Sequence, residues 1–201
     1  MTARPASSVP HLPREAARAV DQFGTSLTDL SRTSPVLVLF LRHTGCTFCR
    51  EALAELASRR EALTEAGIVP AIVHLQTADE PVRELLERYG LADVSRFGDP
   101  QQALYAAFGL ARGGLGNILG PKVWWRGFET TVLRGHLPGK PSGDIRQLPG
   151  AFLVHDGQIL GEFRAETSAD EVPWDELSSC STGLCRPPSA GETPPATGAE
   201  P

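Results

Sequence analysis

A buried strand that leads directly into two cysteines at the start of a helix constrains this chain more than any other feature. The strand is the apolar run VLVLFLR, residues 36–42, whose branched side chains are typical of a strand covered on both faces. After His43-Thr44-Gly45 comes Cys46-Thr47-Phe48-Cys49, followed by a predicted helix over residues 50–65. This order places both sulfurs at the carboxyl end of a central strand, beside a helix N-terminus.

The segments that follow continue as alternating strands and helices. A second buried strand is predicted at 68–75, and a helix begins at Asp79-Glu80-Pro81 and ends at Gly90. A β-α-β-α order predicts parallel strands joined by right-handed crossovers. Near the C-terminus, two apolar runs flank Asp156-Gly157, which is a strong hairpin signal. The chain is therefore predicted to be an α/β protein with a mixed central sheet, helices on both faces and a C-terminal β-hairpin.

Weaker patterns complete the predicted elements. The spacing of apolar residues predicts a helix over 14–32, with Gly24 as its weak point, and a short strand at 94–97. Further helices are predicted from Asp99-Pro100 to about 108, over 115–134 and over 170–177, with a loop at 135–146. One domain over 13–177 is expected, between a disordered N-terminus at 1–12 and a disordered tail rich in cysteine and proline at 178–201.

Composition excludes several classes of function. The chain of 201 residues carries a formal charge of only −5, and its Lys and Arg are scattered, so we expect no nucleic-acid partner. No run of 18 apolar residues is present, and the N-terminus lacks the apolar stretch of a secretory signal. We therefore expect no membrane partner and a cytoplasmic location, where thiols stay reduced. The four cysteines are then better suited to redox or metal chemistry than to structural disulfides.

The C-x-x-C pair at the helix start has a clear chemical logic. Unpaired N–H groups and the helix dipole favour a thiolate on Cys46, which lowers its pKa and makes it a nucleophile. Cys49, one turn later, can resolve a mixed disulfide formed on Cys46. Arg42, His43 and Arg50 lie next to the pair in sequence, and positive charge there would lower the thiol pKa further.

Two other interpretations of the pair stay open. A C-x-x-C is also half of a zinc site, which Cys180 and Cys185 in the tail would complete. The two cysteines would otherwise be ordinary buried residues. The tail pair itself could relay electrons to Cys46 and Cys49, bind metal with them, or have no role. Redox chemistry is the interpretation that we favour, and we expect no bound metal.

Three stretches together resemble a known family. The runs VLVLFLRHTGCTFCREALAEL, DPQQALYAAFGL and QLPGAFLVHDGQIL resemble the peroxiredoxin-like branch of the AhpC/TSA superfamily, most of all selenoprotein L-like and peroxiredoxin-like 2 proteins. The likeness covers roughly residues 14–177. It implies a thioredoxin-like fold, in which a cis-proline loop faces the C-x-x-C. Pro149 matches that proline, so the resemblance implies a cis bond after Leu148, with the Leu148 backbone beside Cys46. Thr44, Leu148 and Pro149 are then expected to bind substrate.

The chain also departs from true peroxiredoxins. Cys46 stands where they carry a threonine, Cys49 where they carry the attacking cysteine, and Pro149 where they carry an arginine. Without that arginine, a peroxide loses a charge-assisted donor, which weakens the case for peroxidase activity. The strand at 36–42 also lacks the buried aspartate by which thioredoxin accepts a proton, a role that His43 could take.

The expected function is thus a thiol–disulfide oxidoreductase or a peroxiredoxin-like antioxidant reductase. Cys46 would attack a disulfide or peroxide substrate and Cys49 would release the product. No nucleotide-binding motif is visible, so we expect no bound cofactor and electrons from an external thiol system of the thioredoxin or glutathione type. The alternative is a redox-sensing or zinc-binding module without turnover.

Overall fold

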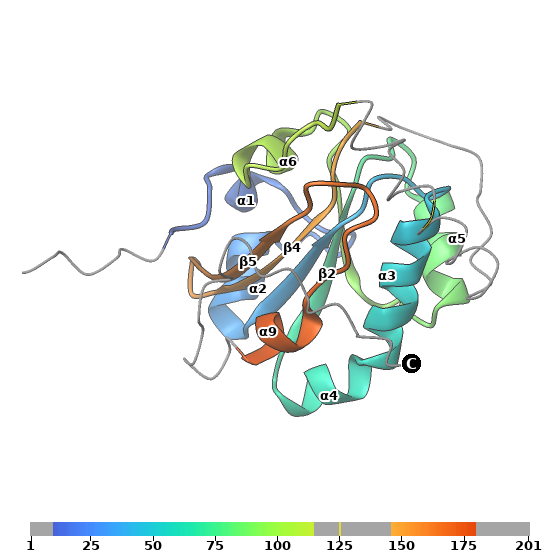
Figure 1. Cartoon of the computed structure of the whole chain (residues 1–201). Helices are drawn as coiled ribbons and strands as arrows, with labels where there is room; N and C mark the ends of the chain where they lie inside the picture. The colour runs from blue at the N-terminus through green and yellow to red at the C-terminus, as the bar shows by residue number, and fades with distance from the viewer. Residues whose placement is uncertain (1–9, 115–124, 126–145, 180–201) are drawn as a thin grey trace, which may run out of the picture.

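The computed structural model describes residues 10–114, 125 and 146–179, and these form a five-stranded mixed sheet flanked by helices (Figure 1). The strand order is β3-β2-β1-β4-β5. Strand β1 is central: it runs parallel to β2 and antiparallel to β4, whereas β3 and β5 lie at the edges. The strands are β1 (Val36–Phe40), β2 (Val69–His74), β3 (Ser95–Gly98), β4 (Gly150–His155) and β5 (Gln158–Arg164).

Helices cover both faces of the sheet. The face that carries the cysteines packs against α3, α5 and α9, and the opposite face packs against α1, α2 and α6 (Figure 1). The helices are α1 (Glu15–Arg18), α2 (Leu27–Thr33), α3 (Thr47–Ser58), α4 (Arg60–Glu65), α5 (Glu80–Arg88), α6 (Ala103–Ala107) and α9 (Trp174–Ser179). None of the helices in the described ranges is both long and apolar enough to cross a membrane.

Strand β1 is buried on both of its faces, which confirms the prediction from its apolar sequence. Its side chains alternate, so that Leu37 and Leu39 join the core beneath α3 whereas Val38 and Phe40 join the core beneath α6. Each of these four side chains is at most 1% exposed. The strand therefore delivers its carboxyl end, and the cysteines after it, from a rigid position.

The predicted helix over 14–32 is wrong, because the segment forms two short helices. Between α1 and α2, the Asp21 carboxylate accepts the backbone N–H groups of Phe23 and Thr25, each at 2.9 Å, and Gly24 has φ +83°. Ser26 then caps α2 by accepting the Asp29 N–H at 3.1 Å. Local side-chain hydrogen bonds thus replace a helical turn that the apolar spacing alone would continue.

Two other helices begin later than predicted, again because an aspartate caps the chain. The Asp99 carboxylate accepts N–H groups from Ala103, Leu104 and Tyr105, so α6 begins at Ala103, and Pro100 lies in the preceding turn. Similarly, Asp170 accepts the N–H groups of residues 166 and 167, and α9 begins only at Trp174.

The hairpin prediction is confirmed. Asp156 and Gly157 connect β4 and β5 with φ values of 46° and 72°, as a tight hairpin turn requires. Residues 10–12 lie along this hairpin, where Leu12 N–H donates to Gly157 O at 2.8 Å. The predicted helix at 115–134, most of the loop at 135–146 and the tail from 180 onward lie outside the described residues.

Candidate active site

The two cysteines occupy the junction between β1 and α3. Cys46 is the residue immediately before α3, where its N–H donates to His43 O at 3.1 Å and its carbonyl accepts the Arg50 N–H at 3.1 Å. Cys49 lies in the first turn of the helix. Both thiols are free rather than joined in a disulfide, and both residues are buried, with 5% and 3% of their surfaces exposed. The motif is thus a reduced pair, one helical turn apart, in the core beneath α3.

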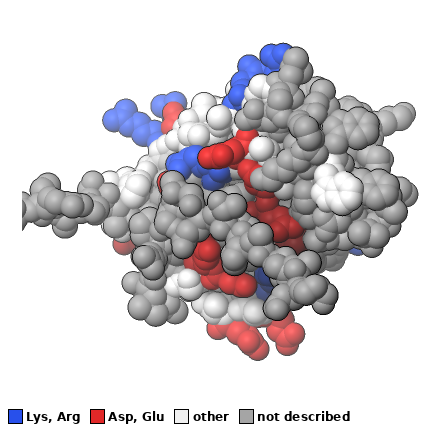
Figure 2. Space-filling view, viewed as in Figure 1, with Lys and Arg blue, Asp and Glu red and all other residues white. Residues whose placement is uncertain are grey.

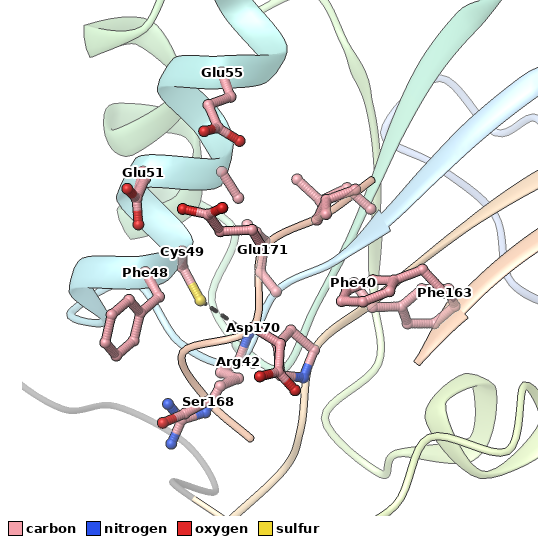
Figure 3. Close-up of a pocket in the computed structure, with 15 residues that line it drawn as sticks. Phe40, Arg42, Phe48, Cys49, Glu51, Glu55, Phe163, Ser168, Asp170 and Glu171 are labelled. Carbon is pink, nitrogen blue, oxygen red and sulfur yellow. Dashed lines mark hydrogen bonds between the residues drawn. The ribbon is translucent and has the colours of Figure 1, made fainter. Parts of the chain in front are cut away.

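Arg42 contacts both sulfurs. Its backbone N–H donates to Cys49 Sγ at 3.3 Å, the contact dashed in Figure 3, and its guanidinium Nη1 donates to Cys46 Sγ at 3.6 Å. Its Nε donates to the carbonyl of Gln147 at 3.0 Å. Arg42 itself is only 4% exposed, so its charge acts on the sulfurs with little screening by solvent. The adjacency of Arg42 to the pair, noted in the sequence, becomes direct contact.

These contacts favour a thiolate on Cys46. A hydrogen bond from the Cys49 thiol lowers the pKa of Cys46 most, and burial opposes this by raising it. The charge of Arg42 and the N–H groups of Cys49 and Phe48 lower it further, although neither N–H closes a full capping hydrogen bond to the sulfur. Together they lower the pKa of Cys46 from an ordinary 9.0 to about 6.

Cys49 has the opposite character. Its hydrogen bond to Cys46, its burial and the negative charge of the Cys46 thiolate all raise its pKa well above 9.0. The N–H groups of His43 and Arg42 lower it by less. The two pKa values are therefore shifted in opposite directions, so that Cys46 is the sulfur of the pair that ionises more readily.

His43 keeps an uncharged ring in this site. Burial, and secondarily the charge of Arg42, lower the pKa of His43 to about 4. Its Nδ1 is buried and has no hydrogen-bond partner within the described part of the chain. The ring is therefore neutral, the form in which an imidazole can accept a proton. The role of His43 as the proton acceptor for the cysteine pair stays a prediction.

The predicted cis bond between Leu148 and Pro149 is wrong, because every peptide bond in the described ranges is trans. The Leu148 N–H donates to Ala111 O at 3.1 Å, and the Leu148 carbonyl accepts the Gln147 side-chain amide at 3.2 Å. These bonds hold the segment extended as it enters β4. The Leu148 N–H is already paired within the fold, so it is not open to a substrate chain.

The expected substrate-binding residues fall on different sides of the motif. Pro149 lines a pocket with Cys49 and Arg42, and its predicted role in substrate binding stays a prediction. Thr44 instead lines a separate, open pocket of about 460 Å³ with Arg50, Glu84 and Arg88. Leu148 lines neither of these two pockets. Pro149, but not Thr44, thus shares a pocket with Cys49.

Residues far away in the sequence complete the site. Gln147 is 1% exposed, and its side-chain amide donates to three carbonyls, those of Leu110, Ala111 and Leu148, each at 3.2 Å. This anchors the carbonyl that holds Arg42. Tyr105 is also fully buried, and its hydroxyl donates to the Leu41 carbonyl and lies 3.2 Å from the Val73 carbonyl, at the carboxyl ends of β1 and β2. No motif marked either residue.

The zinc interpretation depends on residues on both sides of the boundary of the described ranges. No cluster of three or more His, Cys, Asp or Glu able to hold a metal occurs among the described residues. Cys180 and Cys185, which a four-ligand site would need, lie outside that part of the chain.

Comparison with known proteins identifies the family. The model of the AhpC/TSA antioxidant enzyme family matches residues 55–167, more than half of the chain. This chain belongs to the AhpC/TSA family. The match begins within α3, beyond both cysteines, so it establishes the family whereas the case for the cysteine pair rests on the geometry above.

The curated relatives carry two names, prostamide/prostaglandin F synthase and peroxiredoxin-like 2A. A prostamide/prostaglandin F synthase of Salmo salar is 27% identical over 183 residues, covering 88% of each chain. Its counterpart in Danio rerio is 28% identical and covers 82% of each. Peroxiredoxin-like 2A of Homo sapiens is 27% identical over 150 residues, or 72% of this chain and 61% of that one.

Solved structures confirm the thioredoxin-like fold. A mutant of the Peroxiredoxin 6 of Arenicola marina superposes with a TM-score of 0.59 at 9% identity, covering 89% of this chain and 74% of that one. Peroxidoxin BcpB of Mycobacterium tuberculosis gives a TM-score of 0.54 at 18% identity, covering 84% and 93%. At such low identities these likenesses concern the fold alone.

Proposed function

We propose that this protein is a thiol-dependent reductase of disulfide or peroxide bonds, in which Cys46 and Cys49 cycle between dithiol and disulfide. The observation that carries the proposal is the contact of Arg42 with both sulfurs, its guanidinium on Cys46 and its N–H on Cys49. Such contacts stabilise a thiolate, and the thiolate is the nucleophile in thiol–disulfide exchange. The names of the relatives, which include synthases and peroxiredoxin-like proteins, support an enzyme of this class.

With a disulfide substrate, the Cys46 thiolate attacks one sulfur of the substrate and expels the other half as a thiolate. A mixed disulfide on Cys46 results. Cys49, after losing its proton, attacks Cys46 Sγ and expels the second half of the substrate. The substrate is thereby reduced to two thiols, and the protein is left with a Cys46–Cys49 disulfide. An external dithiol of the thioredoxin type, or two glutathione-type thiols, restores the pair.

With a peroxide, the thiolate attacks one oxygen and the other leaves as an alcohol or water after taking up a proton. The sulfur becomes a sulfenic acid, which condenses with the second thiol to a disulfide and releases water. Pro149 cannot donate a charge-assisted hydrogen bond to the peroxide, but the Arg42 guanidinium lies at the Cys46 sulfur and would supply one. Arg42 thus compensates for the arginine that the sequence lacks at 149.

The pocket favours a second order of events. Cys49, and not Cys46, lines the pocket that contains Pro149. In that order Cys49 attacks, and the Cys46 thiolate, which accepts the Cys49 hydrogen bond, takes its proton. The low pKa of Cys46 makes us favour attack by Cys46, as expected from the sequence.

We propose that the protein works in the cytoplasm. The test is a coupled turnover assay with a thioredoxin or glutathione reductant and with either insulin or hydrogen peroxide as substrate. Wild type is compared with Cys46→Ser and Cys49→Ser, and with a Cys180→Ser/Cys185→Ser variant that controls for the tail. We expect turnover in the wild type and tail variant only. Absence of wild-type turnover with both substrates would overturn the proposal in favour of a sensor without turnover.

A further inference from the structure

One peptide group lies between a buried tyrosine and the second cysteine. The Leu41 carbonyl accepts a hydrogen bond from the Tyr105 hydroxyl. The N–H of the same peptide group belongs to Arg42 and donates to Cys49 Sγ at 3.3 Å (Figure 3). Tyr105 belongs to α6 and Cys49 to α3, which pack on opposite faces of the sheet. This peptide group therefore links the two helix layers at the carboxyl end of β1.

Contacts on every side hold the tyrosine and the peptide group in place. The Tyr105 side chain is fully buried, and its ring packs against that of Phe40 in a T-shaped arrangement with centroids 5.0 Å apart. The Asp99 carboxylate accepts the Tyr105 N–H at 3.1 Å. The Leu41 N–H donates to the Val73 carbonyl at 2.9 Å, which ties the peptide to β2. The hydroxyl is thus aimed at the Leu41 carbonyl by a rigid framework.

A hydrogen bond to the carbonyl of a peptide group strengthens its N–H as a donor. The amide is conjugated, so charge drawn toward the oxygen leaves the N–H more positive, and consecutive hydrogen bonds reinforce one another. A stronger donor favours the charged form of the sulfur that accepts from it. Burial, and then the negative charges of an ionised Cys49 and of Asp99, raise the pKa of Tyr105 well above its ordinary value, so the hydroxyl keeps its proton and stays a donor.

The release step of the proposed reaction depends most on this donor. Once Cys46 is joined to the substrate in a mixed disulfide, it carries no charge and cannot take the proton of Cys49. The N–H groups of Arg42 and His43 still favour ionisation of Cys49, and burial still opposes it. Support for the Arg42 N–H therefore matters at the point where Cys49 must become a nucleophile.

We propose that Tyr105 is a positioning residue for the release step, in which its hydroxyl promotes ionisation of Cys49 through the Leu41–Arg42 peptide group. The Cys49 thiolate, its proton lost to solvent, forms a bond to Cys46 Sγ. The substrate sulfur leaves with the electron pair of the broken bond and then takes up a proton. This inference rests on the proposed function, because it concerns one of its steps. Release without help from Tyr105 would satisfy the proposed function equally well.

Other charged groups near Cys49 also enter its titration. Besides Cys46, Arg42 and His43, four carboxyl groups line the pocket that contains Cys49, those of Glu51, Glu55, Asp170 and Glu171. Acidic side chains also gather over the middle of the face shown in Figure 2. None of these groups differs between the variants compared below, so a difference in pH dependence between them reports on the hydroxyl.

The release step can be measured alone by a pH jump. The Cys180→Ser/Cys185→Ser chain is first treated at about pH 5 with one equivalent of methyl methanethiosulfonate, where Cys46 is the thiol that ionises more readily. Cys46 takes up the methylthio group and methanesulfinate leaves. After the jump to higher pH, Cys49 displaces methanethiolate and the Cys46–Cys49 disulfide forms. Mass spectrometry of acid-quenched samples follows the loss of the methylthio adduct and gives the release rate at each pH.

We expect Tyr105→Phe, which removes only the hydroxyl, to slow release about two- to fivefold at pH 7 and to displace its pH midpoint upward. The difference should narrow at high pH, where Cys49 is ionised in both proteins. The midpoint for alkylation of Cys46 should move by less. Tyr89→Phe is the matched control, since it removes the hydroxyl of the other tyrosine of the chain and should change neither rate nor midpoint.

Two further variants separate this role from a purely structural one. Phe108→Leu loosens the same core as Tyr105 without altering the peptide group, so it should lower Tm and leave the midpoint unchanged. In the Tyr89→Phe chain, 3-fluorotyrosine at position 105 is a stronger donor and should move the midpoint downward. Release in Tyr105→Phe that is unchanged, or slowed equally at every pH, would overturn this inference and leave the proposed function intact. A wild-type adduct that no pH resolves would overturn the proposed function as well.

Discussion

Cys46 and Cys49 lie one helical turn apart, yet their surroundings act on them in opposite directions. Cys46 receives the Arg42 guanidinium and the hydrogen bond of its neighbour, and its pKa falls to about 6. Cys49 donates that hydrogen bond, is deeply buried and faces a thiolate, and its pKa rises well above the ordinary value. Two identical side chains thus acquire different pKa values, because one accepts and the other donates in their mutual interaction.

The difference separates reactivity from access. The more acidic thiol, Cys46, does not line the pocket that contains Pro149, whereas the less acidic thiol, Cys49, does. A substrate approaching from that side meets the sulfur with the lower tendency to ionise. Which sulfur attacks is therefore decided by whether ionisation or a position in the pocket wall matters more, and the experiments below distinguish the two.

The largest expected effect is that of Cys46→Ser. This variant should lose turnover by at least about a thousandfold, because the serine hydroxyl does not ionise and no second thiol remains to complete the Cys46–Cys49 disulfide. Turnover coupled to a thioredoxin-type reductant measures it, with near-native circular dichroism as the control for folding. Retention of more than a tenth of wild-type turnover would contradict the comparison.

Cys49→Ser should also stop turnover, but after one chemical step. Cys46 still attacks, and the mixed disulfide accumulates because no thiol releases it. Mass spectrometry after incubation with a small disulfide should find one adduct per chain on Cys46. An adduct that accumulates instead in Cys46→Ser, on Cys49, would assign the attack to Cys49 and make access the deciding property.

Arg42→Met tests the guanidinium that distinguishes the two sulfurs. Without this charge the pKa of Cys46 should rise toward its ordinary value, so that alkylation by iodoacetamide at pH 7 slows by about three- to tenfold. Arg32→Met, on the exposed surface of α2, is the matched control and should leave the rate unchanged. A rate that Arg42→Met does not alter would show that the hydrogen bond from Cys49 suffices.

The pH dependence of alkylation should show a single thiolate. Because deprotonation creates the nucleophile, the rate rises with pH through a midpoint of about 6 and is nearly level between about pH 7 and pH 8. Iodoacetamide kinetics from pH 4 to pH 9 on the Cys180→Ser/Cys185→Ser chain provide the measurement. A midpoint near that of a free thiol, about 8.5, would erase the contrast between the two cysteines.

Gln147→Ala should have the smallest effect on chemistry. The Gln147 carbonyl that binds Arg42 remains in this variant. The carbonyls of Leu110, Ala111 and Leu148, however, lose the side-chain amide that donates to them and anchors the backbone of residue 147. We expect the alkylation midpoint to shift upward by less than in Arg42→Met, with a loss of about 1–3 kcal/mol in the free energy of unfolding. Urea denaturation and the same alkylation profile measure both, and a shift equal to that of Arg42→Met would mean that Gln147 alone positions the guanidinium.

The parts of the molecule that follow from local patterns were predictable from the sequence. The central strand, the hairpin at Asp156-Gly157 and the cysteines at a helix start all depend on neighbouring residues, and the structure has them in place. The predicted helix boundaries were wrong where an aspartate carboxylate accepts hydrogen bonds from backbone N–H groups, as those of Asp21 and Asp99 do. Apolar spacing carries no information about such hydrogen bonds.

The rest of the site depends on contacts between distant segments. Gln147 meets Arg42 across 105 residues of sequence, and the Tyr105 hydroxyl meets the Leu41 carbonyl across 64. Neither position has a motif, because an anchoring amide or a buried hydroxyl acquires its role from the surrounding fold. The trans bond at Pro149 was missed because the cis expectation came from the family resemblance and not from the residues around Leu148.

Gly150 sets a limit on how this site can vary. A Cβ there would lie 2.8 Å from the Phe163 carbonyl oxygen and 2.5 Å from Leu110 Cδ2, so no larger residue fits without moving the backbone of β5. Gly150 directly follows Pro149, which lines the pocket beside Cys49. Libraries that aim to broaden the substrate range can therefore randomise the pocket residues contributed by α3 and by the segment after β5. Gly150 should be kept, because a side chain at this position would displace the backbone of β5.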